Sequence, residues 1–157
     1  MDTKVQLKKM RKMLWMMGVF KIPMIAYVRP RLIHLDDKVA IVNVRLRRRT
    51  KNHLKSMYFG ALAVGADVTA GLHSFYYAEL SRAKISFVFK AMKTEFLKRP
   101  TSTVQFVSEE GLKVKEIFEK AKESGERIND WIQVVAKNED NEIVATFEMQ
   151  ISVKLKN

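Results

Sequence analysis

The feature that most restricts the fold is a long segment without basic residues. No lysine or arginine occurs between Lys55 and Arg82, although these two types make up 29 of the 157 residues. Glycine, alanine and aromatic residues fill much of the segment, which is long enough to cross a bilayer. However, Asp67 stands near its centre and His73 follows, and each is unfavourable in hydrocarbon. We therefore interpret the segment as a helix buried on almost every side inside a globular domain.

Alternating apolar and polar residues predict strands on both sides of this helix. Between Ile85 and Phe96 the apolar positions change phase, which a β-bulge would explain. Residues 138–141, Asn-Glu-Asp-Asn, are typical of a turn and precede the last strand. The expected strands cover residues 38–47, 85–96, 101–107, 131–136 and 142–155.

Two further helices are expected. Residues 3–17 carry apolar side chains at helical spacing, with lysines on the other side. Residues 108–125 have an apolar stripe, with Ser108 as the expected N-cap and Gly125 just past the end.

The order of elements predicts the architecture. Five or six antiparallel strands around one long apolar helix favour an α+β fold, in which a curved antiparallel sheet wraps around the central helix, with an extra N-terminal helix. A chain of this length forms a sizeable core without disulfides or metals. We expect a single domain over residues 1–157, with the N-terminal helix and its lead-in at residues 1–22.

The N-terminal segment has three interpretations. Its basic and then apolar order resembles a secretory signal, but Lys21 and Pro23 interrupt the apolar run and no small-residue cleavage site follows. Binding of the basic helix to a membrane surface is a second interpretation. We favour the third, packing against the domain, and expect a cytoplasmic protein without stable membrane insertion.

The net charge of +12 and the pI of about 10.0 favour a polyanionic partner. A nucleic acid, an anionic membrane and a phosphorylated small molecule such as coenzyme A all qualify. No RNP motif, helix-turn-helix or zinc finger is present, so we do not expect nucleic acid. The absence of cysteine excludes disulfides and thiolate chemistry, and the three histidines lack a metal-ligand spacing, so no metal site is expected.

The run from Asn52 to Asp67 resembles the hot-dog fold thioesterases. It is most similar to the branch that contains phenylacetyl-CoA thioesterase-like proteins and DUF4442-type hot-dog domains. In that family an Asn-containing loop leads into a His-Gly-Gly turn at the start of the central helix, and an acidic residue follows seven positions after the last glycine. Here Asp67 follows Gly60 by seven positions, but Tyr58-Phe59-Gly60 replaces His-Gly-Gly. The order of elements agrees over essentially the whole chain.

The resemblance implies an acyl-CoA thioesterase-like protein that hydrolyses an acyl or aryl-acyl thioester without a cofactor. Asp67 would be the general base or nucleophile, Asn52 would orient the water or thioester, and the N–H groups around Gly60 would hold the oxyanion. The family builds each site from two chains, which implies a homodimer or a dimer of dimers. Further candidates for substrate binding are Tyr58, Phe59 and Thr69.

A basic run, Arg45-Leu-Arg-Arg-Arg-Thr-Lys51, directly precedes this motif. On a strand its alternate arginines would share one face and form a phosphate-sized patch. Its position beside Asn52 favours coenzyme A or an acyl carrier protein as the partner; a solvated sheet edge is the alternative. The candidate phosphate-binding residues are Arg47, Arg48, Arg49, Lys51 and Lys90.

A second function remains open. The loss of the His and one Gly, together with nine methionines and nine phenylalanines, fits a non-catalytic module of the same fold that binds an acyl or lipid ligand. In that case Asp67 would pair with a buried arginine or cap a loop, and Asn52 would be a turn residue. Thr69 would only fill space.

Overall fold

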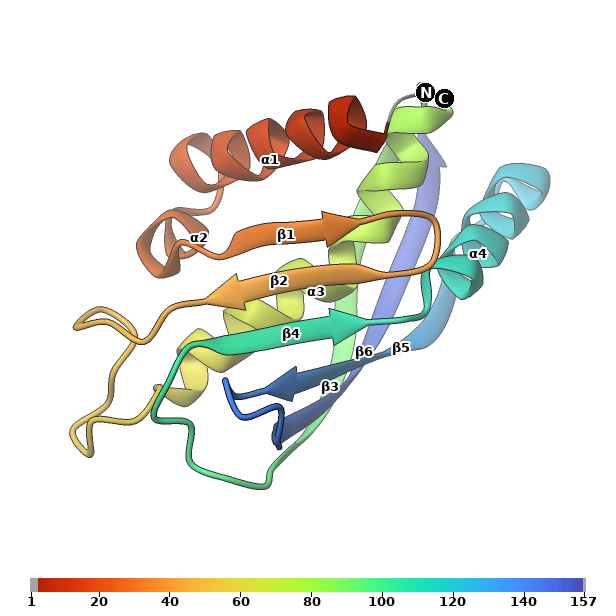
Figure 1. The fold of residues 1–157 in the computed structure, drawn as a ribbon. Coiled ribbons are helices and arrows are strands. Elements are labelled where there is room, and N and C mark those ends of the chain that lie inside the picture. The colour runs from red at the N-terminus through yellow and green to blue at the C-terminus, as the bar shows by residue number, and fades with distance from the viewer. Residues whose placement is uncertain (1–2, 157) are drawn as a thin grey trace.

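The computed structural model describes residues 3–156, which form an antiparallel sheet curved around one long helix (Figure 1). The helices are α1 (Thr3–Phe20), α2 (Pro23–Val28), α3 (Phe59–Leu80) and α4 (Gly111–Ser124). The strands are β1 (Arg31–Leu35), β2 (Ala40–Val44), β3 (Lys84–Phe96), β4 (Val104–Ser108), β5 (Ile128–Lys137) and β6 (Ile143–Lys156).

The six strands lie in the order β1-β2-β4-β5-β6-β3, and each neighbouring pair is antiparallel. β1 and β3 are therefore the two edges. Helix α3 contacts all strands from β2 to β3 across one face of the sheet, and α4 packs beside it against β5 and β6. The predicted curved sheet around a central helix is confirmed.

Helix α3 occupies most of the segment without basic residues, as predicted, and is buried along most of its length. Small residues let it lie close to the sheet. A Cβ atom at Gly65 would come within 2.3 Å of the Phe106 ring, which is itself fully buried on β4. The absence of a side chain at Gly65 thus brings helix and sheet into contact.

The predicted bulge in β3 and the predicted C-terminal end of α4 are confirmed, whereas the predicted start of α4 is not. The β3–β6 register slips between Phe89 and Ala91, which is the expected bulge. Gly125 follows α4 in a left-handed conformation with φ of 68°. The expected N-cap at Ser108 is wrong: Ser108 is the last residue of β4, and α4 begins at Gly111 after Glu110. The backbone N–H of Gly111 is taken by the carbonyl of Lys38, so the start of this helix is decided by a tertiary contact.

The strand predicted over 38–47 is shorter, because β2 ends at Val44. The hydroxyl of Thr50 donates to the carbonyl of Arg45 at 2.7 Å and accepts the N–H of Arg47 at 2.9 Å. This local loop replaces the continuation of the strand. The prediction that alternate arginines project from one strand face is therefore wrong.

The N-terminal helix extends to Phe20, three residues beyond the predicted end, and is followed by the short helix α2, which the sequence did not predict. Pro23 opens α2, where a missing N–H has no intrahelical partner to lose. In Figure 1, α1 and α2 lie outside the sheet beside β1. Within residues 3–156, no helix has the length and hydropathy to cross a membrane.

Candidate active site

A pocket of about 240 Å³ lies between α1, α2, α3 and the edge strand β3. Its wall is built mainly from apolar side chains, and Asp67 is the one ionisable residue among those that line it. The apolar walls are contributed by Met13, Met17, Ile22, Ile25, Phe75, Phe87 and Phe89, with further residues of the same helices and strand. This is a site shaped for an apolar ligand with one carboxylate beside it.

Burial raises the pKa of Asp67 from 3.8 to about 6, because its charged form loses solvation among apolar neighbours. Within residues 3–156 no hydrogen bond or ion pair to this carboxylate is found, and desolvation is the sole cause of the shift. Asp67 therefore neither pairs with a buried arginine nor caps a loop. A poorly solvated carboxylate with this pKa is ionised at pH 7 and is a stronger base than an exposed aspartate.

The N-terminus of α3 is open. The carbonyl of Tyr58 accepts the N–H groups of Ala61 at 3.0 Å and Leu62 at 3.2 Å, so the N–H groups of Phe59 and Gly60 precede the first intrahelical bonds. The Tyr58 and Phe59 rings are exposed and lie 4.7 Å apart, centroid to centroid. Within residues 3–156 no hydrogen bond from the N–H of Phe59 or Gly60 is found, and these groups, with the positive end of the helix dipole, make this end suitable for an anion or a developing oxyanion.

Asn52 shapes the loop before α3. Its Oδ1 accepts the N–H of Leu54 at 2.9 Å, the N–H of Ser56 at 3.1 Å and the Ser56 hydroxyl at 3.1 Å. Two backbone donors on one atom identify that atom as oxygen, which leaves the Nδ2 donor for another partner. The turn role considered for Asn52 is therefore present, and the role of Nδ2 toward a thioester stays a prediction.

One chain does not bring Asp67 and the open helix end together. Asp67 follows Gly60 by seven positions on one continuous helix, which corresponds to about 10 Å along the axis and nearly the same side of the helix. A thioester carbonyl held at Gly60 is thus out of reach of the Asp67 carboxylate of the same chain.

The remaining predicted site residues are dispersed. Arg47, Arg48, Arg49 and Lys51 are exposed on the loop between β2 and α3, and the Arg49 guanidinium lies 5.4 Å from the centroid of the Tyr27 ring. Lys90 is exposed at the bulge of the edge strand β3. Thr69 does not line the pocket. It is fully buried and donates its hydroxyl to the carbonyl of Gly65 at 2.6 Å.

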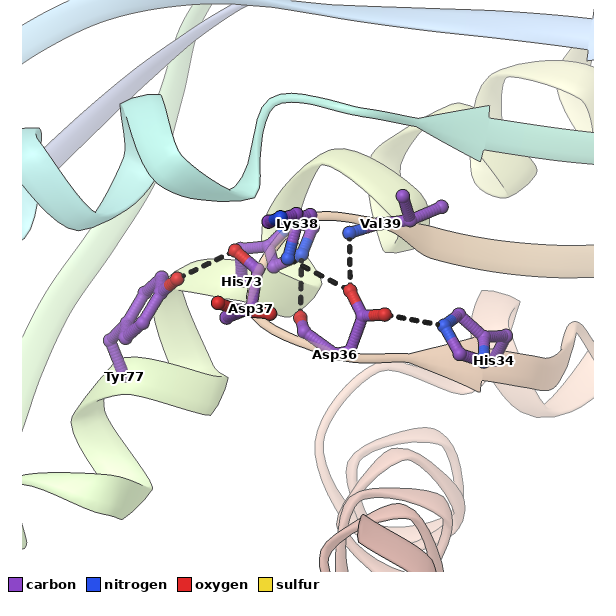
Figure 2. A network of polar contacts seen from close by, with 7 residues as sticks. All are labelled: His34, Asp36, Asp37, Lys38, Val39, His73 and Tyr77. Atoms are coloured by element: carbon purple, nitrogen blue, oxygen red, sulfur yellow. Dashed lines mark hydrogen bonds and ion pairs between the residues drawn. The ribbon is translucent and has the colours of Figure 1, made fainter.

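A polar network that the sequence did not predict holds the far half of α3 (Figure 2). The Nε2 of His73 bonds to the carbonyl of Asp36 at 3.1 Å, and the Tyr77 hydroxyl donates to the carbonyl of Asp37 at 2.8 Å. Burial lowers the pKa of His73 to about 4, so its ring is neutral at pH 7. In the sequence, the sign of this network is the four-residue spacing of His73 and Tyr77 on a mainly apolar helix, which places both side chains on one face.

The turn between β1 and β2 is fixed at the other end of this network. Burial would raise the pKa of Asp36, but hydrogen bonds from the Val39 and Lys38 N–H groups and from His34 outweigh it and lower the pKa to about 2. Asp36 is therefore a structural carboxylate. Within residues 3–156, no group of three His, Asp or Glu side chains is arranged to hold a metal ion.

The chain is similar to known proteins over nearly its whole length. The family model described as "Domain of unknown function (DUF4442)" matches residues 10–153. A comparison with curated proteins gives no match. A protein of unknown function from Chlorobaculum tepidum superposes with a TM-score of 0.82 at 12% identity, over 96% of this chain and 97% of that chain.

Two thioesterases have the same fold. One from Haemophilus influenzae gives a TM-score of 0.70 at 11% identity, over 95% of this chain and 90% of its own. A variant of one from Pseudomonas aeruginosa gives 0.67 at 13%, over 93% and 94%. The resemblance carried by residues 52–67 is thus confirmed at the level of family and fold. The chain belongs to the DUF4442 family and has the hot-dog fold.

Proposed function

We propose that this protein is a thioester hydrolase that acts on an acyl or aryl-acyl thioester of coenzyme A. The observation that carries the proposal is the unpaired Asp67 carboxylate, with its raised pKa, in an apolar pocket. The thioesterases of the same fold from Haemophilus influenzae and Pseudomonas aeruginosa support it. The apolar pocket takes the acyl group, and the carboxylate acts at its thioester end.

In this mechanism Asp67 removes a proton from a water molecule as the water oxygen attacks the thioester carbonyl carbon. The N–H groups at Phe59 and Gly60 stabilise the oxyanion that forms. The carbon–sulfur bond then breaks, the coenzyme A thiolate receives the proton from Asp67, and the carboxylic acid leaves. No cofactor takes part in these steps.

Two chains are needed for this geometry, because the helix end and Asp67 of one chain do not converge. The edge strand β3 offers the surface for a second copy: it is 13 residues long, and Val88, Met92 and Phe96 are exposed along it. A long apolar edge strand favours pairing with another chain. Phe87, Val88 and Phe89 of this strand also line the pocket, so a partner there would lie beside Asp67.

The phosphates of coenzyme A have candidate partners on the loop before α3. Arg47, Arg48, Arg49 and Lys51 are exposed there, next to Asn52, and Lys90 lies at the β3 edge. Guanidinium groups bind phosphate through paired hydrogen bonds. Tyr58 and Phe59 stand between this loop and the helix end and would contact the pantetheine arm. An acidic acyl carrier protein remains an alternative carrier for the same loop.

A panel of short, medium, long and aryl acyl-CoA substrates tests the proposal, with release of free thiol as the readout. We expect turnover by the wild-type protein and none by the Asp67→Asn variant. A protein that hydrolyses no thioester but retains bound acyl ligand after purification would instead be a binding module. The departure of Tyr58-Phe59-Gly60 from His-Gly-Gly is the feature that favours this second function.

The dimer is tested by Met92→Lys. Met92 is 46% exposed on β3 and does not line the pocket, so we expect the variant to fold. Two lysines brought together by a symmetric edge contact repel, and we expect the dimer dissociation constant to rise at least about tenfold, measured by analytical ultracentrifugation. Leu112→Lys on α4 is the matched control. A Met92→Lys protein that remains as dimeric as wild type would exclude pairing through β3.

The role of the Asn52 amide is tested by two substitutions that differ in one group. Asn52→Asp keeps the oxygen that accepts the Leu54 and Ser56 donors and removes the Nδ2 donor, whereas Asn52→Ala removes both. We expect Asn52→Ala to lower the unfolding free energy by about 1–2 kcal/mol, with Asn52→Asp close to wild type. We expect both to lower kcat/KM at least about tenfold. Wild-type kinetics in Asn52→Asp would limit this residue to loop support.

A further inference from the structure

The outer face of α1 and α2 carries an exposed apolar surface that, apart from Ile22, does not line the pocket. Residues 13–20 contain no polar side chain, and Trp15 and Phe20 are 62% and 72% exposed. Their rings contact edge to face, with centroids 6.3 Å apart. We call this surface the α1–α2 patch; its exposed members are Trp15, Met16, Val19, Phe20, Ile22, Met24 and Tyr27.

Packing of α1 against the domain does not require the patch. The opposite face of the helix is the one that packs, with Met10 and Leu14 almost fully buried. Arg11 ties the same helix to β1 by donating to the Leu32 carbonyl at 2.8 Å, and Lys9 forms an ion pair with Glu79 of α3. α1 is thus held in place by one face while a contiguous apolar set on the other meets water. Such a surface marks an interaction site.

The charged side chains on the segment that carries the patch have one sign. No aspartate or glutamate occurs from residue 3 to residue 35, and eight lysines and arginines do. Lys8, Lys12, Lys21 and Arg29 are exposed. On the α-helical wheel, Lys8 and Lys12 lie on the same outward side as Trp15 and Val19. Aromatic and aliphatic side chains between basic residues are the composition of a helix that lies in the interface of an anionic bilayer.

We propose that the α1–α2 patch binds reversibly to a membrane surface that contains anionic lipid. Trp15 and Phe20 enter the boundary between headgroups and acyl chains, and Lys8, Lys12 and Lys21 contact the lipid phosphates. A second copy of this chain fits the patch less well, because a two-fold contact would place the same basic residues against each other. The proposal goes beyond hydrolysis and does not depend on it.

The patch and the pocket are formed by the same two helices. Met13, Leu14 and Met17 of α1 line the pocket, and so do Ile22 and Ile25 at α2. Ile22 belongs to both, because it lines the pocket and is also exposed. A protein docked through the patch therefore presents its apolar cavity directly behind the bound helices, next to a source of acyl chains.

Vesicle flotation of the full chain tests the proposal. We compare vesicles of phosphatidylcholine alone with vesicles in which about 30% of the lipid is phosphatidylglycerol. We expect binding to the anionic vesicles that weakens at high salt, because screening shortens the electrostatic range from about 8 Å at 0.15 M to about 3 Å at 1 M. In a Trp131→Phe background, Trp15 is the remaining tryptophan, and its emission should shift to the blue on binding.

Matched variants distinguish binding through the α1–α2 patch from nonspecific adsorption of the protein to lipid. Trp15→Ser with Phe20→Ser is expected to lower the partition coefficient at least about tenfold, whereas Leu112→Ser with Ile143→Ser, at positions 49% and 45% exposed elsewhere, should leave it unchanged. Lys8→Gln with Lys12→Gln should weaken binding, and Lys115→Gln with Lys120→Gln on α4 should weaken it much less.

Three results would overturn the proposal. The first is no flotation with anionic vesicles at low salt. The second is flotation that the Trp15 and Phe20 substitutions leave unchanged. The third is a wild-type oligomer that loses copies when Trp15 and Phe20 are replaced and binds no vesicles, which would show that a second copy covers the patch. Thioester hydrolysis in free solution is unaffected by any of these outcomes, so the two proposals fail separately.

Discussion

Replacing Asp67 with asparagine is expected to abolish thioester hydrolysis and to stabilise the fold by about 2 kcal/mol at pH 7. The carboxylate is held in an apolar pocket, where burial raises its pKa from 3.8 to about 6. At pH 7 it is ionised in both the folded and the unfolded chain, and its charge is less well solvated in the folded one. Asparagine keeps the shape of the side chain and removes its charge. The substitution therefore removes both the proposed general base and the free-energy cost of burying a charged carboxylate.

The sign of the effect follows from the two pKa values. Between pH 3.8 and about 6 the folded chain binds more protons at Asp67 than the unfolded chain, so this group lowers stability as the pH rises. Below pH 3.8 the carboxyl is neutral in both states, and the advantage of Asp67→Asn should vanish. Urea unfolding at pH 7 and at pH 3.5 measures this, with Asp140→Asn, an exposed carboxylate, as the control.

His73 changes the stability of the fold with pH in the opposite direction to Asp67, over nearly the same pH range. Its pKa falls from 6.5 to about 4 on folding, so the unfolded chain binds more protons there, and stability is lost as the pH falls from 6.5 toward 4. The two groups offset each other in the wild type. In Asp67→Asn only the His73 contribution remains, so its stability should fall more steeply with acidification than that of the wild type.

Two results would contradict this account of Asp67. Wild-type turnover in Asp67→Asn would remove the carboxylate from the mechanism. A destabilised variant at pH 7 would show that the carboxylate makes favourable contacts. In the wild type, kcat/KM should rise with pH through about 6, as the base loses its proton.

Gly111→Ala is expected to lower the unfolding free energy by about 3 kcal/mol, the largest loss of stability that we predict. A Cβ atom at Gly111 would lie 2.3 Å from the carbonyl oxygen of Asp37 and 2.6 Å from Nε2 of His73. Neither neighbour can move freely, because Tyr77 holds the Asp37 carbonyl and the Asp36 carbonyl holds His73. The methyl group would separate α4 from the turn between β1 and β2.

Gly71→Ala is the matched control for thermal or urea unfolding. A Cβ atom at Gly71 would meet nothing closer than the Phe87 ring at 3.5 Å, an ordinary contact, and alanine favours the helix by up to about 1 kcal/mol. We expect Gly71→Ala to be as stable as wild type or slightly more stable. A Gly111→Ala protein that unfolds at the same urea concentration as wild type would show that the turn between β1 and β2 can shift to make room for the methyl group without loss of stability.

Much of the fold could be predicted because it depends on local patterns. A helix buried on all sides cannot carry lysine or arginine without an unpaired charge, so the gap between Lys55 and Arg82 marked α3. The phase change near Phe89 marked the β3 bulge for a similar reason, since one extra residue reverses which side chains face the core. Residues 52–67 indicated the family by resemblance, and the match of the family model over residues 10–153 shows it.

Positions where a specific contact overrides the local sequence pattern could not be predicted in the same way. Arg45 to Arg47 alternate like a strand, yet Thr50 closes a loop over them and β2 ends at Val44. Ser108 has the chemistry of an N-cap, yet it is the last residue of β4 and pairs with Ala40 of β2. In both cases a contact stronger than local propensity decided the structure.

The class of fold and the buried central helix could be derived from the sequence alone, because burial and periodicity restrict residue types wherever they occur. The resemblance of residues 52–67 indicated the family and made Asp67 a candidate site residue. The folded structure was needed to show which side chains surround Asp67, which hydrogen bonds of His73 and Tyr77 hold α3, and which face of α1 stays exposed. These depend on how the sheet curves and on which segments far apart in the chain meet, and the order of residues along one element carries no record of those contacts.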